Sequence, residues 1–300
     1  MATIIGGIAT SHIPAIGGAI AGKRFQDPYW KPFFDGYPPV IAWLERMRPD
    51  VAVVVYNDHG LNFFLDKMPT FAIGAAAEYR NADEGWGLTP VAPFPGHPAL
   101  SWHVIESLVA DEFDLTTCQE MLVDHGFAVP MQLLWPGRTA WPMRSVPVAV
   151  NTVQHPLPSP KRCYNFGQAL GKAIESFPED LKVVIVGTGG LSHQLDGQRA
   201  GFINRDFDLM CMDKIVADPA ALGEEILETT ELMHQFEGRG MDRVAAEIAK
   251  EIRVFFQDHD IDAGAREQET GHDPRRPTPG DTASDGDFLH TFPRLIVAGS

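Results

Sequence analysis

The sequence predicts an α/β fold, with a central, mainly parallel or mixed β-sheet flanked by helices and followed by an atypical acidic C-terminal segment. Short apolar segments alternate with amphipathic helical patterns through residues 1–186, which is typical of α/β layers. The segments VAVVVY and KVVIV show no polar alternation, so we expect helices to cover both of their faces. With 300 residues, of which 44% are hydrophobic, the chain has enough apolar material for a full core.

The individual elements follow from composition, length and periodicity. β-Branched or apolar runs that end in turn-forming residues predict strands at residues 3–10, 50–56, 146–153 and 181–186. Apolar residues at helical spacing predict helices at residues 40–47, 98–110 and 161–177. Residues 84–98 are rich in Gly and Pro, so we expect a long ordered loop or lid there, without regular structure.

The C-terminal part changes character. Residues 241–256 have apolar side chains at helical spacing and predict one more core-facing helix. From 257 to 288, nine acidic residues accompany three arginines and few large apolar residues, which is the composition of a solvated tail. Only residues 289–297, LHTFPRLIV, are apolar enough to dock again. We therefore expect a folded domain at residues 1–256 and an acidic, poorly ordered tail at 257–300.

Charge and composition exclude several classes of function. The formal net charge is −16, and without a basic stripe we expect no nucleic-acid partner. The longest apolar run, at residues 51–56, is too short to cross a bilayer, and no signal peptide is recognisable at the N-terminus. We expect a cytoplasmic protein that does not contact the membrane. Three cysteines without a CxxC pair predict neither a disulfide framework nor a thiolate metal site.

The histidines are the most informative feature. His12 follows the first predicted strand, His59 follows the second, and His193 follows the fourth. Because ligands bind beyond the carboxyl ends of parallel strands, residues from distant parts of the chain can meet there. A further histidine, His125, lies in the sequence VDHG. We expect these side chains to form one site.

Such a site suits a first-row metal ion. Two histidines and one carboxylate leave open positions on ferrous iron for a substrate and dioxygen, and zinc would accept the same ligands. A further histidine could take a proton from a bound phenol. Asn57 and Asp58 stand beside His59, where they could orient its imidazole or simply form a turn after the strand.

Several motifs carry a resemblance to a known family. From residue 1 to about residue 219, the chain resembles the LigB-like type II extradiol dioxygenases, the family of the β (catalytic) subunit of protocatechuate 4,5-dioxygenase and of the gallate and 3-O-methylgallate dioxygenases. The matching motifs occur in the same order as in that family: GGIATSHIP, DVAVVVYNDHG, DEGWG, GHP, DEFDL, VDHG, GTGGLSHQLDGQRAG and INRDFDL. Residues 1–256 then correspond to the catalytic domain.

The resemblance implies non-haem Fe(II) and the opening of a catechol carboxylate by O2, beside the two hydroxyls and not between them. His12 and His59 match the iron-binding histidines. His193 matches the catalytic acid/base, His125 a second active-site histidine, and Asn57 an active-site asparagine.

The third metal ligand departs from the family pattern. The family has a glutamate where this chain reads Glu237-Gly238-Arg239-Gly240, with Gly240 at the ligand position. Glu237 is our first choice for the missing ligand, because it lies three residues before that position and can share a helical face with it. Asp242 and Glu247 are alternatives, and loss of activity or a changed substrate or metal would also explain the difference.

The resemblance also implies a separate small α subunit in an α2β2 assembly. We expect donors such as Arg162, Arg199 or backbone N–H groups to bind the substrate carboxylate. Two other functions stay open: a non-catalytic binding or scaffold protein on the same fold, and a zinc-dependent hydrolase that uses the same histidines.

Overall fold

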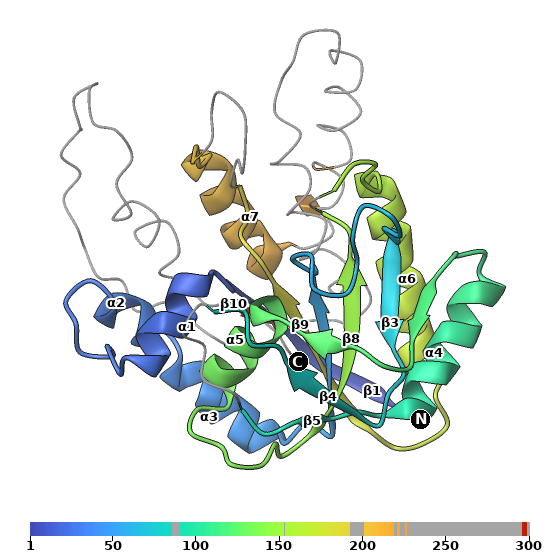
Figure 1. Cartoon of the computed structure of the whole chain (residues 1–300), viewed down its shortest axis with the longest axis horizontal. Coiled ribbons are helices and arrows are strands. Elements are labelled where there is room, and N and C mark those ends of the chain that lie inside the picture. The colour runs from blue at the N-terminus through green and yellow to red at the C-terminus, as the bar shows by residue number, and fades with distance from the viewer. Residues whose placement is uncertain are drawn as a thin grey trace, which may run out of the picture.

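A mixed β-sheet runs through the centre of the computed structural model, which describes residues 1–85, 91–152, 154–192, 201–218, 221–222, 226 and 296–298. In that part of the chain the sheet has seven strands, in the order β10-β1-β9-β2-β8-β3-β6 (Figure 1). Four strands are mutually parallel and form its middle: β1 (Thr3–Thr10), β9 (Lys182–Thr188), β2 (Val51–Tyr56) and β8 (Arg144–Val150). The prediction of a mainly parallel or mixed sheet is confirmed.

The outer strands make the sheet mixed. β3 (Phe71–Gly74) pairs antiparallel with β8 and parallel with β6 (Thr116–Cys118), and β10 (Ile296–Ala298) pairs antiparallel with β1. A small second sheet consists of β4 (Glu78–Asn81), β5 (Phe94–Pro95) and β7 (Leu122–Val123).

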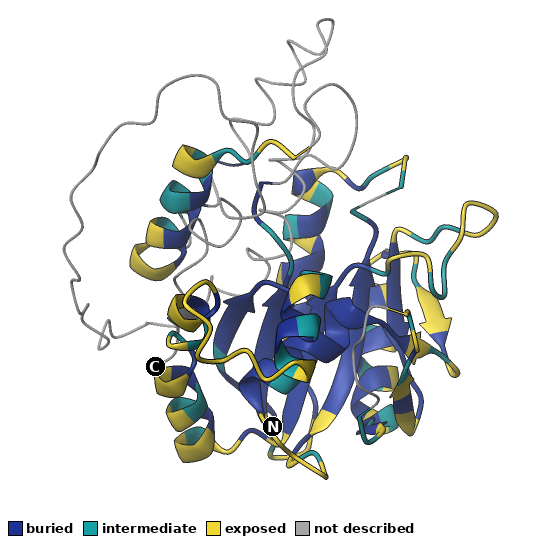
Figure 2. Cartoon of the chain, turned by 60° about the vertical axis from the view of Figure 1, so that its left-hand side comes forward, coloured by how far each residue is buried: buried dark blue, intermediate teal, exposed yellow. Residues whose placement is uncertain are grey.

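Helices cover both faces of the central sheet. On one face lie α1 (Pro14–Ala21), α2 (Lys31–Phe34), α3 (Pro38–Met47) and α5 (His125–Leu134), whose apolar side chains pack into one core cluster. On the other lie α4 (Pro98–Ala110) and α6 (Pro160–Glu175), which form a second cluster with the sheet. α7 (Arg205–Ala217) packs beside β10. The strands between these layers are buried almost throughout (Figure 2).

Most of the elements predicted from the sequence are present. The strand at 3–10 and the helix at 98–110 have the predicted bounds, and the other predicted strands and helices are shifted by a few residues. The expectation that residues 84–98 lack regular structure is wrong at Phe94–Pro95, which pair with β4. Gly96 permits this pairing, because a Cβ there would lie 2.1 Å from the carbonyl oxygen of Ala76.

The C-terminal expectations are tested only in part. Residues 296–298, which overlap the segment expected to dock again, pair with β1. The helix predicted at 241–256 and the rest of the acidic tail lie outside the described residues. In the described part of the chain, no helix has the length and apolar character needed to cross a membrane.

The topology brings three loops to one edge of the sheet. β9 lies between β1 and β2 and is parallel to both, so the carboxyl ends of these strands meet at the same edge. Helix α5 packs on β2 and β9. The residues that follow β1 and β2 therefore lie close to the end of β9.

Candidate metal centre

Three imidazoles cluster at the carboxyl edge of the sheet. His12 follows β1, His59 follows β2, and His125 is the first residue of α5. The ring centroids are 5.0 Å apart for His12 and His59, 4.0 Å for His59 and His125, and 5.7 Å for His12 and His125. The structure thus brings together three of the four histidines that the sequence singled out.

His12 is oriented by the end of β9. Its Nδ1 lies 2.9 Å from the Thr188 hydroxyl, which donates its own proton to the carbonyl oxygen of Gly126 at 2.8 Å. Thr188 therefore accepts from the His12 Nδ1–H. In neutral His12 this leaves a lone pair on Nε2, where a metal ion could bind.

A proline in α5 leaves the Gly126 carbonyl available for this contact. Pro130 lies inside the helix and has no N–H, so it cannot donate to the carbonyl four residues earlier, which is that of Gly126. The hydroxyl of Thr188 takes the place of the missing helical donor. A helix irregularity and the orientation of His12 are thereby linked through one carbonyl oxygen.

His59 is held by a buried carboxylate. Asp124 Oδ2 accepts from both the backbone N–H of His59, at 2.8 Å, and its ring Nδ1–H, at 2.9 Å. The other oxygen, Oδ1, accepts from the N–H of Gly126 and caps the start of α5. On the far side of the ring, the Asn57 amide lies 3.0 Å from Nε2, so the lone pair of His59 also sits on Nε2.

His125 is held in the same way by Glu84. One carboxylate oxygen of Glu84 lies 2.8 Å from the His125 Nδ1, and the other accepts from its backbone N–H at 2.7 Å. The carboxylate also faces the first turn of α5, where the helix dipole favours a negative charge. All three imidazoles therefore bind an acceptor through Nδ1 and keep Nε2 for another partner.

Burial favours the neutral form of His12. The pKa of His12 is well below its usual value, first because burial disfavours the charged imidazole and then because His59 and His125 are close. Burial alone would raise the pKa of Asp124, but the hydrogen bonds from the ring and the backbone N–H of His59 outweigh it and hold this pKa below its usual range. A neutral imidazole beside an ionised carboxylate is the protonation state that metal binding needs.

The donor set fits a first-row metal ion. Imidazoles that ligate a metal almost always donate their other N–H to a carboxylate, carbonyl or other acceptor, which fixes the tautomer. When two imidazoles bind one ion, each metal–nitrogen distance is about 2.0–2.1 Å. With a nitrogen–metal–nitrogen angle of about 90–110°, the two ring centres then lie roughly 4.5–5 Å apart. The 5.0 Å between His12 and His59 agrees with this spacing.

Asp124 lies close enough to two of the imidazoles to share an ion with them, but its hydrogen bonds argue for an orienting role. Ligand atoms of His59, Asp124 and His125 lie within 4.8 Å of one another, close enough for a shared ion. Both oxygens of Asp124, however, already accept hydrogen bonds from N–H groups of His59 and Gly126. Its proximity to His59 is explained by these bonds.

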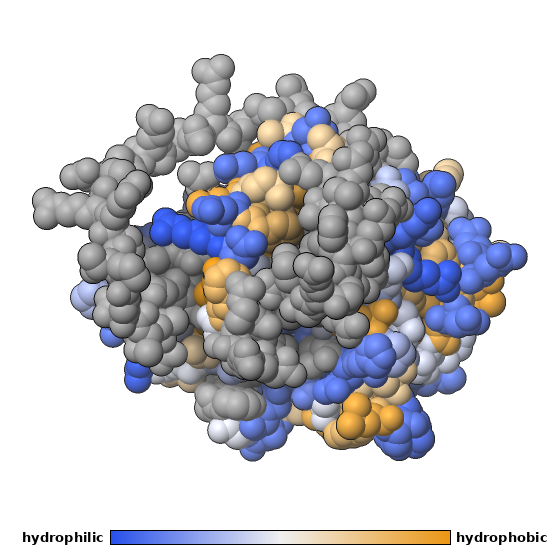
Figure 3. Space-filling view, turned by 90° about the horizontal axis from the view of Figure 1, so that it is seen from above, coloured by the Kyte–Doolittle hydropathy of each residue, from blue (hydrophilic) through white to orange (hydrophobic). Residues whose placement is uncertain are grey.

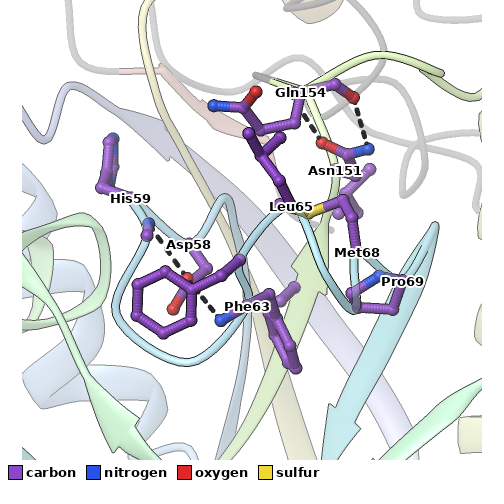
Figure 4. Close-up of a pocket in the computed structure, with 12 residues that line it drawn as sticks. Asp58, His59, Phe63, Leu65, Met68, Pro69, Asn151 and Gln154 are labelled. Carbon is purple, nitrogen blue, oxygen red and sulfur yellow. Dashed lines mark hydrogen bonds between the residues drawn. The ribbon is translucent and has the colours of Figure 1, made fainter.

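The structure shows what three more of the predicted residues, Asn57, Asp58 and Arg162, contact. Asn57 contacts His59, whereas Asp58 accepts from the backbone N–H groups of residues 60–63 and organises the loop after β2 (Figure 4). Asp58 therefore forms a turn and does not orient the ring. Arg162 lies over the ring of Phe113, 4.4 Å from its centroid, and so is engaged elsewhere. The remaining candidates lie outside the described residues: His193, Arg199, Glu237, Asp242 and Glu247.

Three residues of the site were missed from the sequence: Glu84, Asp124 and Thr188. Each lies in one of the motifs that carry the family resemblance, namely DEGWG, VDHG and GTGGLSH. A signal for Asp124 was available, because Asp before an apolar run is a typical helix N-cap. Glu84 and Thr188 act through contacts between distant segments, which no local pattern predicts.

A cavity of about 240 Å³ adjoins the cluster and includes His59 in its lining. It lies between the loop after β2 and the end of β8 (Figure 4). Its other walls are mainly apolar.

Comparison with known proteins identifies a family for most of the chain. The profile of the family described as "Catalytic LigB subunit of aromatic ring-opening dioxygenase" matches residues 6–245. This range contains every histidine of the cluster and also His193 and Glu237.

Two relatives show how far the similarity extends. A gallate dioxygenase of Pseudomonas putida is 47% identical over 157 residues, which are 52% of this chain and 46% of the relative. A 2,3-dihydroxyphenylpropionate/2,3-dihydroxicinnamic acid 1,2-dioxygenase of Rhodococcus jostii is 37% identical over 152 residues, 51% of this chain and 46% of the relative. The matched part of the chain spans about half the length of these relatives.

Proposed function

The chain belongs to the family of catalytic LigB subunits of aromatic ring-opening dioxygenases, and from this premise we propose that it is an Fe(II)-dependent extradiol dioxygenase of catechol carboxylates. The observation that carries the proposal is the cluster of three imidazoles, each with Nδ1 bound to an acceptor. Because such bonds fix the tautomer with a free Nε2, they support metal binding more strongly than the presence of the histidines alone.

In this proposal the ion is held by His12 and His59 and by one carboxylate. Glu237 remains our first choice for the carboxylate, with Asp242 and Glu247 as alternatives. Fe(II) at such a site supplies the redox chemistry that allows dioxygen to react with an aromatic ring. Thr188 and Asp124 keep the two imidazoles in the ligating tautomer, so that little reorganisation accompanies binding.

The other polar residues act on the substrate. His193 removes the proton of a ring hydroxyl, since an imidazole exchanges protons near neutral pH, and returns it when the ring opens. His125, fixed by Glu84, accepts a hydrogen bond from a substrate hydroxyl through Nε2. Asn57 now donates to the Nε2 of His59, and once that nitrogen ligates the ion, its amide is free to donate to substrate.

We propose a protocatechuate- or gallate-type acid as the substrate, opened beside its two hydroxyls. The similarity to a gallate dioxygenase supports this class. Since Arg162 stacks on Phe113, Arg199 or backbone N–H groups are the better candidates to bind the carboxylate.

We also propose that a small α subunit covers the site in an α2β2 assembly. Phe64 and Leu65, in the loop that follows His59, are 55% and 78% exposed, which supports a partner on this side. Sedimentation of the chain with such a subunit tests the assembly, and two species that sediment independently would contradict it.

The test of the function is oxygen consumption and ring opening by the Fe(II)-loaded chain, prepared without oxygen, with gallate and protocatechuate. We expect stoichiometric oxygen uptake with at least one of them. His193→Ala should keep its iron but lose ring opening by several orders of magnitude. Retained turnover would remove His193 from the mechanism, and hydrolysis with zinc, or a chain that binds no metal, would overturn the proposal.

A further inference from the structure

One buried carboxylate takes no part in the contacts of the metal centre. Asp208, the fourth residue of α7, is 0% exposed, and neither of its oxygens has a hydrogen-bond partner among the described residues. The other buried side-chain atoms without a partner in this part of the chain belong to Tyr56, Ser101 and Gln132, so Asp208 is the only carboxylate among them. A buried acceptor that forms no hydrogen bond costs stability, and its presence in a native fold needs an explanation.

Solvent does not supply the missing partner. The surface seen from above has hydrophilic side chains among hydrophobic ones (Figure 3), whereas Asp208 has no exposed area. Its neighbours on the helix are apolar or only weakly polar. Asp208 shares a helix face with the buried residues Cys211, Met212 and Ile215. The carboxylate therefore has bonding capacity that neither water at the surface nor its own helix uses.

The helix face that carries Asp208 lies at the carboxyl edge of the sheet. Cys211 and Met212 pack in one cluster with Leu191, which follows β9, and with Ala9 of β1. His12 comes three residues after Ala9. The unused carboxylate is thus held by the same two strands, β1 and β9, whose ends position His12.

Ser192 places the carboxylate close to His193. The Ser192 hydroxyl accepts from the backbone N–H of Asn204 at 2.7 Å, and Asn204 caps the start of α7. Burial raises the pKa of Asp208 to about 6, and the Ser192 hydroxyl lowers it by less, so this serine lies beside the carboxylate. His193 follows Ser192 directly, and consecutive Cα atoms are only about 3.8 Å apart.

The imidazoles of the cluster show what a functional histidine at this edge requires. His12, His59 and His125 each have Nδ1 bound to an acceptor, and for two of them the acceptor is a carboxylate. A histidine that takes a proton through Nε2 benefits from the same arrangement. The acceptor at Nδ1 fixes the tautomer, and an ionised carboxylate stabilises the imidazolium that forms.

We propose that Asp208 is a positioning residue for His193, with a carboxylate that accepts from the Nδ1–H of this imidazole and leaves Nε2 to exchange a proton with the substrate. The inference rests on the proposed function, in which His193 is the acid/base. The proton of the substrate hydroxyl goes to Nε2 of His193, and Asp208 keeps its negative charge throughout. A buried charge that costs stability is then retained for the reaction.

The first test is the pH profile of ring opening by Fe(II)-loaded Asp208→Asn, with gallate and protocatechuate. We expect kcat to fall about 100-fold, with KM and iron content unchanged. The acid limb of the kcat profile should move about one pH unit lower, because the imidazolium of His193 loses an anionic partner and its pKa falls. Asp206→Asn is the matched control, since Asp206 lies on the same helix but is exposed. It should change neither kcat nor the profile.

The second test does not depend on activity. Nitrogen-15 NMR of the iron-free chain with labelled histidines reports the tautomer and the pKa of His193, whose signal is identified by its loss in His193→Ala. We expect the Nδ1–H tautomer in the wild type. In Asp208→Asn, but not in Asp206→Asn, the pKa of His193 should be lower by about one pH unit.

The outcomes separate this pairing from the function. If Asp208→Asn leaves the tautomer and pKa of His193 unchanged, or lowers kcat without moving the acid limb, the pairing is refuted and the dioxygenase stands. A kcat within twofold of wild type refutes it as well. If NMR shows the pairing but the wild-type chain opens no ring, the proposed function fails while Asp208 still positions His193.

Discussion

Replacement of the buried carboxylate that holds His59 is the most informative single change. In Asp124→Asn the side chain keeps its size but has one carbonyl oxygen in place of two carboxylate oxygens. Asp124 now accepts from His59 through Oδ2 and from Gly126 through Oδ1. The asparagine can accept on only one side, so its NH2 group must face an N–H donor on the other.

The size of the loss in metal affinity depends on which hydrogen bond of Asp124 the asparagine cannot form. Asn is a good N-cap, so the cap on Gly126 can survive, and the NH2 group then faces the His59 ring. The ring must turn or move its proton to Nε2, the nitrogen needed for the metal. Loss of such an orienting partner typically lowers metal affinity 10–100-fold, or about 1.4–2.7 kcal/mol. We expect Fe(II) or Co(II) to bind Asp124→Asn more weakly by this factor.

The assay is calorimetric titration of the metal, together with chemical denaturation of the apoprotein. Ser159→Ala is the control, because Ser159 caps α6 through the N–H of Arg162 and touches no imidazole. It should cost about 1 kcal/mol of stability with no change in metal affinity. An Asp124→Asn affinity within twofold of wild type would refute the orienting role. A loss above about 1,000-fold would identify Asp124 as a ligand.

Three further changes test other contacts. Burial raises the pKa of Asp208 from 3.8 to about 6, against a smaller pKa-lowering effect of Ser192. The folded state therefore holds this proton more tightly than the unfolded chain does. The free energy of unfolding should fall as pH rises from about 3.8 to 6. Asp208→Asn should remove this pH dependence and raise the free energy of unfolding by up to about 3 kcal/mol at pH 8. Denaturation curves that show an unchanged pH dependence of the free energy of unfolding would contradict this. The hydroxyl of Tyr56 is buried with no partner in the structure, so Tyr56→Phe should leave stability unchanged or raise it by about 1 kcal/mol, whereas a clear loss would reveal a partner. Pro130→Ala restores an N–H that competes with Thr188 for the Gly126 carbonyl. We therefore expect the apoprotein to be more stable in thermal denaturation but to bind metal several-fold more weakly. A metal affinity equal to that of the wild type would show that the carbonyl serves both donors.

Sequence reasoning worked best where a pattern is local and regular. The strand at 3–10 and the helix at 98–110 were predicted with their observed bounds, because apolar periodicity and turn residues lie within each segment. The meeting of His12 and His59 followed from one topological rule, that parallel strands end at the same edge of a sheet.

The elements that were missed depend on distant contacts. Helix α5 is buried along nearly its whole length and contains Pro130, so it shows neither a polar face nor an uninterrupted helical pattern. The two-residue strand β5 exists because Gly96 lets the chain approach Ala76. Glu84 reaches His125 across 41 positions of sequence. Such pairings are properties of the fold and not of any short segment.

The central claim is that His12 and His59 bind one metal ion through Nε2. X-ray absorption of the Fe(II)-loaded chain tests it most directly, because imidazole ligands give a characteristic scattering pattern. We predict at least two imidazoles at about 2.0–2.1 Å, with one fewer in His12→Ala and in His59→Ala wherever these variants retain any iron. A spectrum without imidazole, or one that both variants leave unchanged, would contradict the account.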